Sequence, residues 1–226
     1  LWTVIDSILA QGPPLSDRAG ATGLALGYVQ SGKTTAITAL TAAAADSGYR
    51  VVVALLGSTN LLLEQNHSRL LHSLGLDHRQ DYRWVVMVNP TGATKTKELA
   101  NWLSRGRTIL VPVLKHAGRI SALAKVLSAI DDDLPVLIID DEADQASLNT
   151  EVNRNQVSRT YDALTQLRDA VPRHLYVQFT ATPYAPLLLE PDDHLRPDFI
   201  ELLQPGEGYT GGREFFVDHA DVVVRP

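Results

Sequence analysis

Residues 27–35 read GYVQSGKTT and match the pattern GxxxxGK[ST], with Gly27, Gly32, Lys33 and Thr34 at its fixed positions. An apolar run at 22–29 leads into the pattern, and an Ala-rich helical pattern over 34–45 follows it. In this strand–loop–helix context the glycines turn backbone N–H groups inward, and the helix presents its positive end to an anion. The stretch therefore predicts a phosphate-binding loop within an α/β fold.

The side chains of the loop indicate which ligands it binds. An ammonium at Lys33 suits the β- and γ-phosphates of a nucleotide, and the Thr34 hydroxyl is a hard oxygen ligand for Mg²⁺. We therefore predict ATP and Mg²⁺ as ligands, and we expect the phosphates to contact Gly27, Gln30, Ser31, Gly32, Lys33, Thr34 and Thr35.

Apolar runs and helical patterns alternate along most of the chain. The spacing predicts strands at 22–29, 51–56, 84–88, 108–114, 134–139 and 174–179, and helices at 34–45, 60–74, 95–104, 119–130 and 156–170. The strands are continuously apolar, which is typical of strands buried on both faces. This order predicts a mostly parallel sheet with helices on both faces, and the loops at its carboxyl edge should carry the chemistry.

The pattern becomes irregular and rich in Pro and Gly after Pro183. We therefore expect one domain over 1–183 and an irregular extension over 184–226 that packs on it. Because the chain begins at Leu1 and ends without a tail-like composition, we expect it to be a piece of a longer protein.

Composition narrows the functional classes. The 226 residues include no cysteine, which rules out disulfides and thiolate zinc sites and favours a cytoplasmic location. The seven histidines show no HxxxH or HxxH spacing, so we expect them to be surface or loop residues. No apolar stretch is long enough to span a membrane. The net charge of −6 disfavours a general polyanion-binding surface, although a local basic groove remains compatible with it.

A second cluster of functional residues follows the predicted strand at 134–139. The chain continues there as Asp140-Asp141-Glu142-Ala143-Asp144. One carboxylate at a strand end can hold Mg²⁺, and the next can orient or deprotonate the attacking water. We assign Asp141 to the metal and Glu142 to the water. A shift of one residue would instead make Asp140 the metal-side acid.

These motifs resemble those of superfamily-two helicases. Residues 141–144 spell DEAD, and 179–183 (FTATP) resemble the Ser/Thr-Ala-Thr motif that follows it. The resemblance implies a RecA-like P-loop ATPase in which Asp144, Thr180 and Thr182 couple hydrolysis to movement. Without that context, the two threonines would read as ordinary strand-end residues.

Two further segments are similar to nucleic-acid-contacting helicase motifs. Residues 57–60 (GSTN) head a predicted helix, and 116–120 (HAGRI) are weakly similar to the next motif. The resemblance makes Ser58, Thr59, Asn60 and Arg119 candidate contacts to DNA phosphates. The alternative is that the first three are ordinary helix caps and that Arg119 is a solvated surface charge.

The strings GYVQSGKTT, LIIDDEADQAS, FTATPYAP and PGEGYTGGREFF together resemble the Z-one domain family, which comprises endonuclease-associated, helicase-like ATPases of bacteria. The likeness implies a DNA-dependent ATPase in a restriction or phage-defence system. It also implies a second RecA-like domain that supplies arginine fingers, so that the chain alone should hydrolyse ATP slowly or not at all. A nuclease is an expected partner, because none of the five lysines has an acid two residues before it.

Two other functional classes compete with the motor hypothesis. In the first, the chain is a nucleotide-controlled switch that recruits a nuclease or other partner without translocation. In the second, it is a small-molecule kinase, which should carry an arginine-rich lid. The region after 183 offers few arginines for such a lid: Arg196, Arg213 and Arg225.

Overall fold

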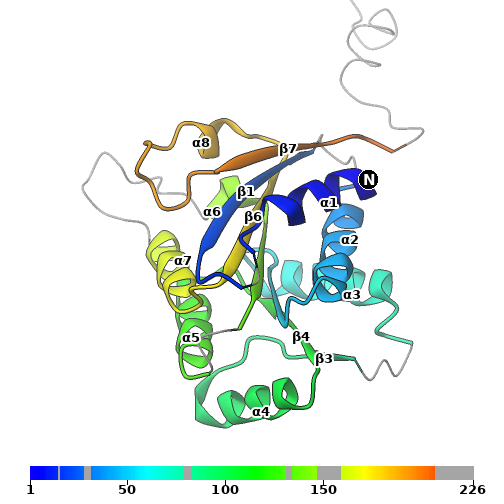
Figure 1. The fold of residues 1–226 in the computed structure, drawn as a ribbon, viewed down its shortest axis with the longest axis vertical. Helices are drawn as coiled ribbons and strands as arrows, with labels where there is room; N and C mark the ends of the chain where they lie inside the picture. Colours follow the sequence, from blue (N-terminus) through cyan, green and yellow to red (C-terminus); the bar gives the residue numbers. More distant parts are fainter. Residues whose placement is uncertain (15, 28–31, 79–82, 131–133, 147–158, 207–226) are drawn as a thin grey trace, which may run out of the picture.

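The computed structural model describes residues 1–14, 16–27, 32–78, 83–130, 134–146 and 159–206. Strands and helices alternate through most of this part (Figure 1). The strands are β1 (Gly20–Gly27), β2 (Val51–Leu55), β3 (Trp84–Val86), β4 (Thr108–Val113), β5 (Val136–Asp141), β6 (His174–Thr180) and β7 (Phe199–Leu203). The helices are α1 (Trp2–Gln11), α2 (Lys33–Asp46), α3 (Asn60–Leu74), α4 (Gly92–Ser104), α5 (Ala117–Leu127), α6 (Ala143–Ala146), α7 (Arg159–Asp169) and α8 (Tyr184–Leu187).

The seven strands form one sheet in the order β3-β4-β2-β5-β6-β1-β7. Every pair of neighbouring strands is parallel, which confirms the predicted sheet. Parallel strands need crossovers, and the intervening helices supply them. All strands therefore end at the same edge, which is called the carboxyl edge below.

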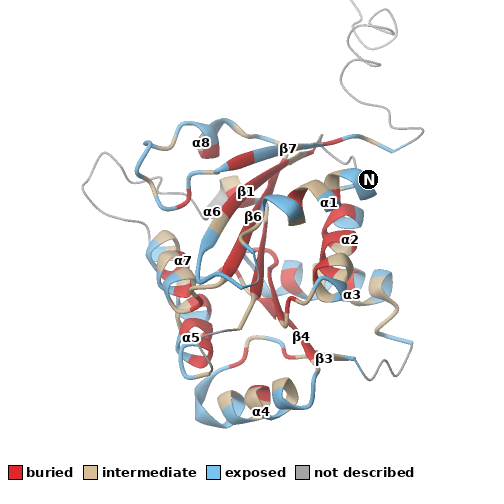
Figure 2. Ribbon diagram, viewed as in Figure 1, coloured by how far each residue is buried: buried red, intermediate tan, exposed pale blue. Residues whose placement is uncertain are grey.

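Two apolar layers cover the sheet, as expected for strands without polar alternation. One layer packs α1, α2 and α3 against strand residues that include Leu137, Ile139, Leu175 and Val177. The other packs α4, α5 and α7 against the alternate residues, including Val136 and Ile138. The central strands are accordingly buried on both faces (Figure 2). This alternation decides which face each strand-end residue serves.

The predicted irregular extension over 184–226 includes two regular elements in its described part. Residues Tyr184–Leu187 form α8, and β7 pairs with β1 as an edge strand of the main sheet. In β7 the residues Phe199 and Leu203 are buried, whereas Ile200 and Leu202 are exposed. Half-burial explains why this strand lacks the continuous apolar run of the others. The remainder of the predicted extension, 207–226, lies outside the described residues.

None of the helices in the described part of the chain combines the length and apolar character that a membrane crossing requires.

Candidate nucleotide-binding site

Three strands bring the predicted motifs to one place at the carboxyl edge. β1 ends at Gly27, and its neighbour β6 carries Thr180 directly opposite Leu26. On the other side of β6, Asp141 at the end of β5 lies opposite Phe179. The phosphate loop and the acidic cluster therefore leave the same edge, with one strand between them. The sequence correctly predicted the shared edge but did not reveal the intervening strand.

Two glycines border the phosphate loop in the described part of the chain. Gly27 closes β1, and Gly32 adopts a left-handed conformation with φ 93° directly before α2. Among the described residues, no side chain caps the amino end of α2. Lys33, Thr34 and Thr35 form its first turn and are partly or fully exposed. Backbone N–H groups and an ammonium are thus available to an anion. The predicted contacts Gln30 and Ser31 lie outside the described residues.

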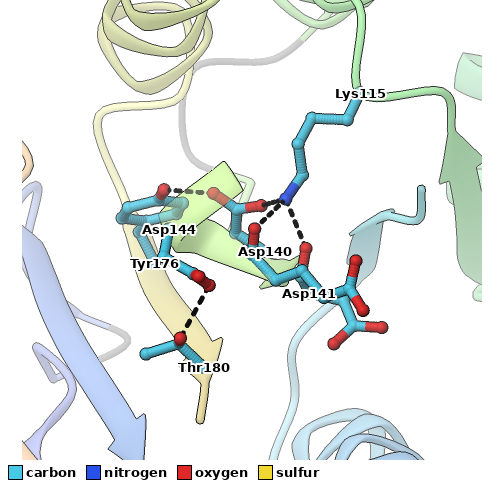
Figure 3. Close-up of polar contacts among 7 residues, drawn as sticks. Lys115, Asp140, Asp141, Asp144, Tyr176 and Thr180 are labelled. Atoms are coloured by element: carbon cyan, nitrogen blue, oxygen red, sulfur yellow. Dashed lines mark hydrogen bonds and ion pairs between the residues drawn. The ribbon is translucent and has the colours of Figure 1, made fainter. Parts of the chain in front are cut away.

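Strand alternation separates Asp140 from Asp141. Asp140 is fully buried, and it accepts a 2.7 Å hydrogen bond from the Tyr176 hydroxyl. Its other carboxylate oxygen lies 2.7 Å from Lys115 Nζ (Figure 3). Asp141 is the next residue, so it shares the face of Ile139, against which α2 packs. The side chain of Asp140 is therefore occupied on the opposite face, which favours Asp141 as the metal-side acid.

The environment of Asp141 disfavours its ionised form. Burial raises the pKa of Asp141, and the neighbouring charge of Glu142 raises it further. The ammonium groups of Lys115 and Lys33 act in the opposite direction without cancelling the rise. The charge of Lys33, on α2, therefore reaches the carboxylate at the end of β5. A divalent cation bound between these groups would relieve the repulsion between the two acids.

Asp144 joins the acidic cluster to the end of β6. The Thr180 hydroxyl donates a 2.7 Å hydrogen bond to Asp144 Oδ1, and the Thr182 hydroxyl donates a 2.5 Å bond to Oδ2. Burial raises the pKa of Asp144, but these two hydrogen bonds, together with a backbone hydrogen bond and the charge of Lys115, outweigh it and lower the net value. The three residues predicted to act in coupling are thus in direct contact, and the link between Asp144 and Thr180 is visible in Figure 3.

The candidate DNA contacts head two helices at the carboxyl edge. Ser58, Thr59 and Asn60 are exposed where β2 leads into α3, and Arg119 is exposed in the first turn of α5, after β4. Thr59 caps α3 by accepting a 3.3 Å hydrogen bond from the N–H of Leu62. Thr59 therefore has the helix-capping role that was the alternative to a DNA contact. The exposed side chain of Arg119 can reach a ligand.

Sequence reasoning gave no role to Lys115 or Tyr176, both of which contact Asp140. Both residues are far from Asp140 in the sequence, so no local pattern predicts these contacts. The available signal was a lysine directly after an apolar strand, since a charge in such a place needs a partner.

A second missed group lies beyond the end of α3. His72 Nδ1 is 2.8 Å from Asp77 Oδ2, and His78 Nε2 is 3.1 Å from the same oxygen. One potential ligand atom from each residue lies within 4.8 Å of the others. A turn at Gly75, with φ 69°, folds the chain back and brings together two histidines that lack HxxxH or HxxH spacing. All three side chains are exposed, and they belong to the opposite end of α3 from the candidate site.

Several solved structures share this fold. The Pyrococcus furiosus Hef helicase domain matches 84% of this chain and 36% of its own chain, with 18% identity and a TM-score of 0.52. The DUF1998 helicase MrfA bound to DNA matches 89% of this chain and 26% of its own, with 12% identity and a TM-score of 0.54. The same helicase bound to DNA and AMPPNP matches 90% and 26%, with 11% identity and the same TM-score. The chain has the fold of a RecA-like helicase domain.

No family model and no curated protein matches the chain. The chain spans about a third of the Hef helicase domain and about a quarter of MrfA. The likeness therefore shows the fold of one RecA-like domain, and the activity and partners of the whole protein are matters for proposal.

Proposed function

We propose that this chain is the ATP-binding motor domain of a DNA-dependent, superfamily-two helicase-like ATPase. The observation that carries the proposal is the meeting of two motifs at one sheet edge: the uncapped start of α2 with Lys33, and the acids Asp141 and Glu142 at the end of β5. The ammonium of Lys33 also acts to lower the pKa of Asp141, which supports a shared site.

The residues present fit a magnesium nucleotide. In this proposal the N–H groups at Gly32 and the ammonium of Lys33 bind the phosphates. Thr34 and Asp141 hold Mg²⁺, which supplies charge neutralisation of the phosphates when it is bound. The exposed carboxylate of Glu142 orients the attacking water and accepts its proton. In the same proposal, Asp144, Thr180 and Thr182 couple hydrolysis at this site to movement of neighbouring parts of the protein.

The proposed partners follow from what the motor mechanism requires beyond this chain. A second RecA-like domain would supply arginine fingers to complete the nucleotide cleft. DNA would bind through its phosphates at Ser58, Thr59, Asn60 and Arg119, where helix starts and a cation are exposed. The helicase MrfA, which shares the fold, has been solved with DNA and AMPPNP. This supports a nucleotide and DNA as ligands.

The resemblance to the Z-one domain family supports a narrower proposal. The protein would act in a bacterial restriction or phage-defence system, with a nuclease as partner. The motifs that carry this resemblance are the phosphate loop, LIIDDEADQAS, FTATPYAP and PGEGYTGGREFF. Loss of protection against phage infection in a host that carries Glu142→Gln would support this role. Undiminished protection would refute it.

The central test is ATP turnover by the intact protein with and without DNA. We expect DNA to stimulate turnover, and Glu142→Gln to lower kcat by about 10²–10⁴-fold while ATP binding persists. Glu190→Gln is the matched control, because Glu190 is exposed outside the site. Equal turnover by Glu142→Gln and the wild type would refute the assignment of the catalytic base.

The switch hypothesis predicts a different outcome in the same system. A switch recruits its partner with a non-hydrolysable nucleotide as well as with ATP, because binding alone fixes the conformation. A motor loses its translocation along DNA under those conditions. Partner capture that is independent of hydrolysis, together with no DNA stimulation, would therefore favour the switch.

A further inference from the structure

Lys115 follows β4 and is a buried cation. It is 5% exposed, and its ammonium lies 2.7 Å from Asp140 Oδ1. Burying a lysine is unfavourable unless its charge and its three donors are all satisfied. The ammonium meets this requirement, and its other contacts show what the lysine can do.

Two of these contacts are carbonyl groups of the acidic cluster (Figure 3). Lys115 Nζ donates to the backbone oxygen of Asp141 and, at 2.9 Å, to that of Glu142. Glu142 has a φ of 54°, a left-handed conformation that is unfavourable for a residue with a side chain. The ammonium is thus hydrogen-bonded to the backbone of the turn that carries the carboxylates of Asp141 and Glu142.

The backbone of Lys115 joins the two candidate DNA segments. Its N–H donates a 3.0 Å hydrogen bond to the carbonyl of Gly57, directly before the exposed Ser58–Asn60 turn. The next residue, His116, caps α5 by accepting a 3.2 Å hydrogen bond from the N–H of Gly118. Arg119 lies in the first turn of that helix. Lys115 is therefore hydrogen-bonded to the first candidate DNA segment and to the turn that carries the catalytic acids, and it directly precedes the second segment in the chain.

We propose that Lys115 is a positioning residue that couples DNA binding to ATP hydrolysis. DNA phosphates held at the start of α3 or α5 shift the backbone at Lys115. Its ammonium transmits the shift to the carbonyls of Asp141 and Glu142, and so sets the direction of both carboxylates. This inference rests on the proposed function, because it presupposes a DNA-stimulated ATPase.

The test must separate charge neutralisation from positioning. Lys115→Met alone leaves Asp140 buried without its cation and risks a misfolded protein. The double variant Lys115→Met/Asp140→Asn removes both charges. Asp140→Asn alone keeps the two carbonyl contacts of the ammonium but leaves its charge buried without an anion, so this variant is assayed well below its own Tm. Lys125→Met is the surface control, because Lys125 is exposed on α5.

The measurement is kcat and KM for ATP in the intact protein, with and without single-stranded DNA. In the double variant we expect the DNA stimulation of kcat to fall at least about tenfold, with KM for ATP within about threefold of the wild type. Asp140→Asn and Lys125→Met should retain the stimulation. A purely structural role would lower Tm without this separation of kcat from KM.

Two outcomes overturn the coupling role alone. One is a wild-type stimulation ratio in the double variant, and the other is an equal loss in Asp140→Asn, which would assign the effect to the ion pair. A wild-type protein without DNA-stimulated turnover would instead refute the proposed function itself. The two failures are therefore distinguishable.

Discussion

Tyr176→Phe should destabilise the fold by removing a buried hydroxyl that Asp140 depends on. Tyr176 is fully buried, and its hydroxyl donates a 2.7 Å hydrogen bond to Asp140. Phenylalanine keeps the ring, so no large cavity forms. A hydrogen bond to a charged group contributes about 1.5–3 kcal/mol. Because Lys115 still pairs with the other carboxylate oxygen, we expect the free energy of unfolding to fall by about 2 kcal/mol. That loss corresponds to a decrease in Tm of about 4–8 °C.

Urea unfolding, with thermal unfolding in parallel, measures this effect. Tyr161→Phe is the matched control, because its hydroxyl donates a 3.0 Å hydrogen bond to Asp193 in a partly exposed setting. We expect the control to lose about 0.5–1 kcal/mol, as is typical of less buried hydrogen bonds. A loss below about 0.5 kcal/mol for Tyr176→Phe, or equal losses in both variants, would refute the view that the buried Asp140 depends on this hydroxyl.

Three further predictions concern the site and its supporting turns. Mg-ATP at about 100 times its Kd should stabilise the protein by about 2.7 kcal/mol, which corresponds to a rise in Tm of about 5–10 °C. Lys33→Ala should abolish this rise in a thermal shift assay. The raised pKa of Asp141 means that the fold disfavours its ionised form, so this group's contribution to stability falls as pH rises from the ordinary value of 3.8 through the raised value. Asp141→Asn should therefore have a higher Tm than the wild type near neutral pH in metal-free buffer. The difference should disappear in acid, and a lower Tm for the variant at neutral pH would contradict the prediction. Gly57→Ala should cost about 1–3 kcal/mol of unfolding free energy, since Gly57 has φ 71° and an added Cβ would lie 2.6 Å from Leu62 Cβ. Gly206→Ala is the control, because a Cβ there meets nothing within 4 Å, and equal losses in urea unfolding would refute the strain argument.

Local pattern was sufficient to predict most of the sheet. The predicted apolar runs at 51–56 and 134–139 supply the buried residues of β2 and β5, which the structure makes neighbouring strands. The edge strand Phe199–Leu203 escaped prediction because only one of its faces is covered. The helix Trp2–Gln11 was also not predicted, although Ile5 and Ile8 bury one face of it.

The candidate site was predictable to the extent that it lies within short motifs. Fixed spacings identify the glycines and the lysine of the loop, and also the acids at the end of β5. Such spacings reflect local backbone geometry, which the sequence alone can indicate. The choice between Asp140 and Asp141 needed the packing of each face of β5. Lys115 is 25 residues before Asp140 in the chain, and its pairing arises from the neighbouring positions of β4, β2 and β5, which no local pattern encodes.

The position of β6 also sets the distance between β1, which leads into the phosphate loop, and β5, which ends in the acids. With one strand inserted between the loop strand and the acid strand, their backbones are held about 9–10 Å apart, twice the ordinary interstrand distance. The ends of these two strands therefore lie on either side of Thr180, the last residue of β6. A longer side chain at Thr180, which is fully buried and hydrogen-bonded to Asp144, would therefore disturb the strand that sets this spacing.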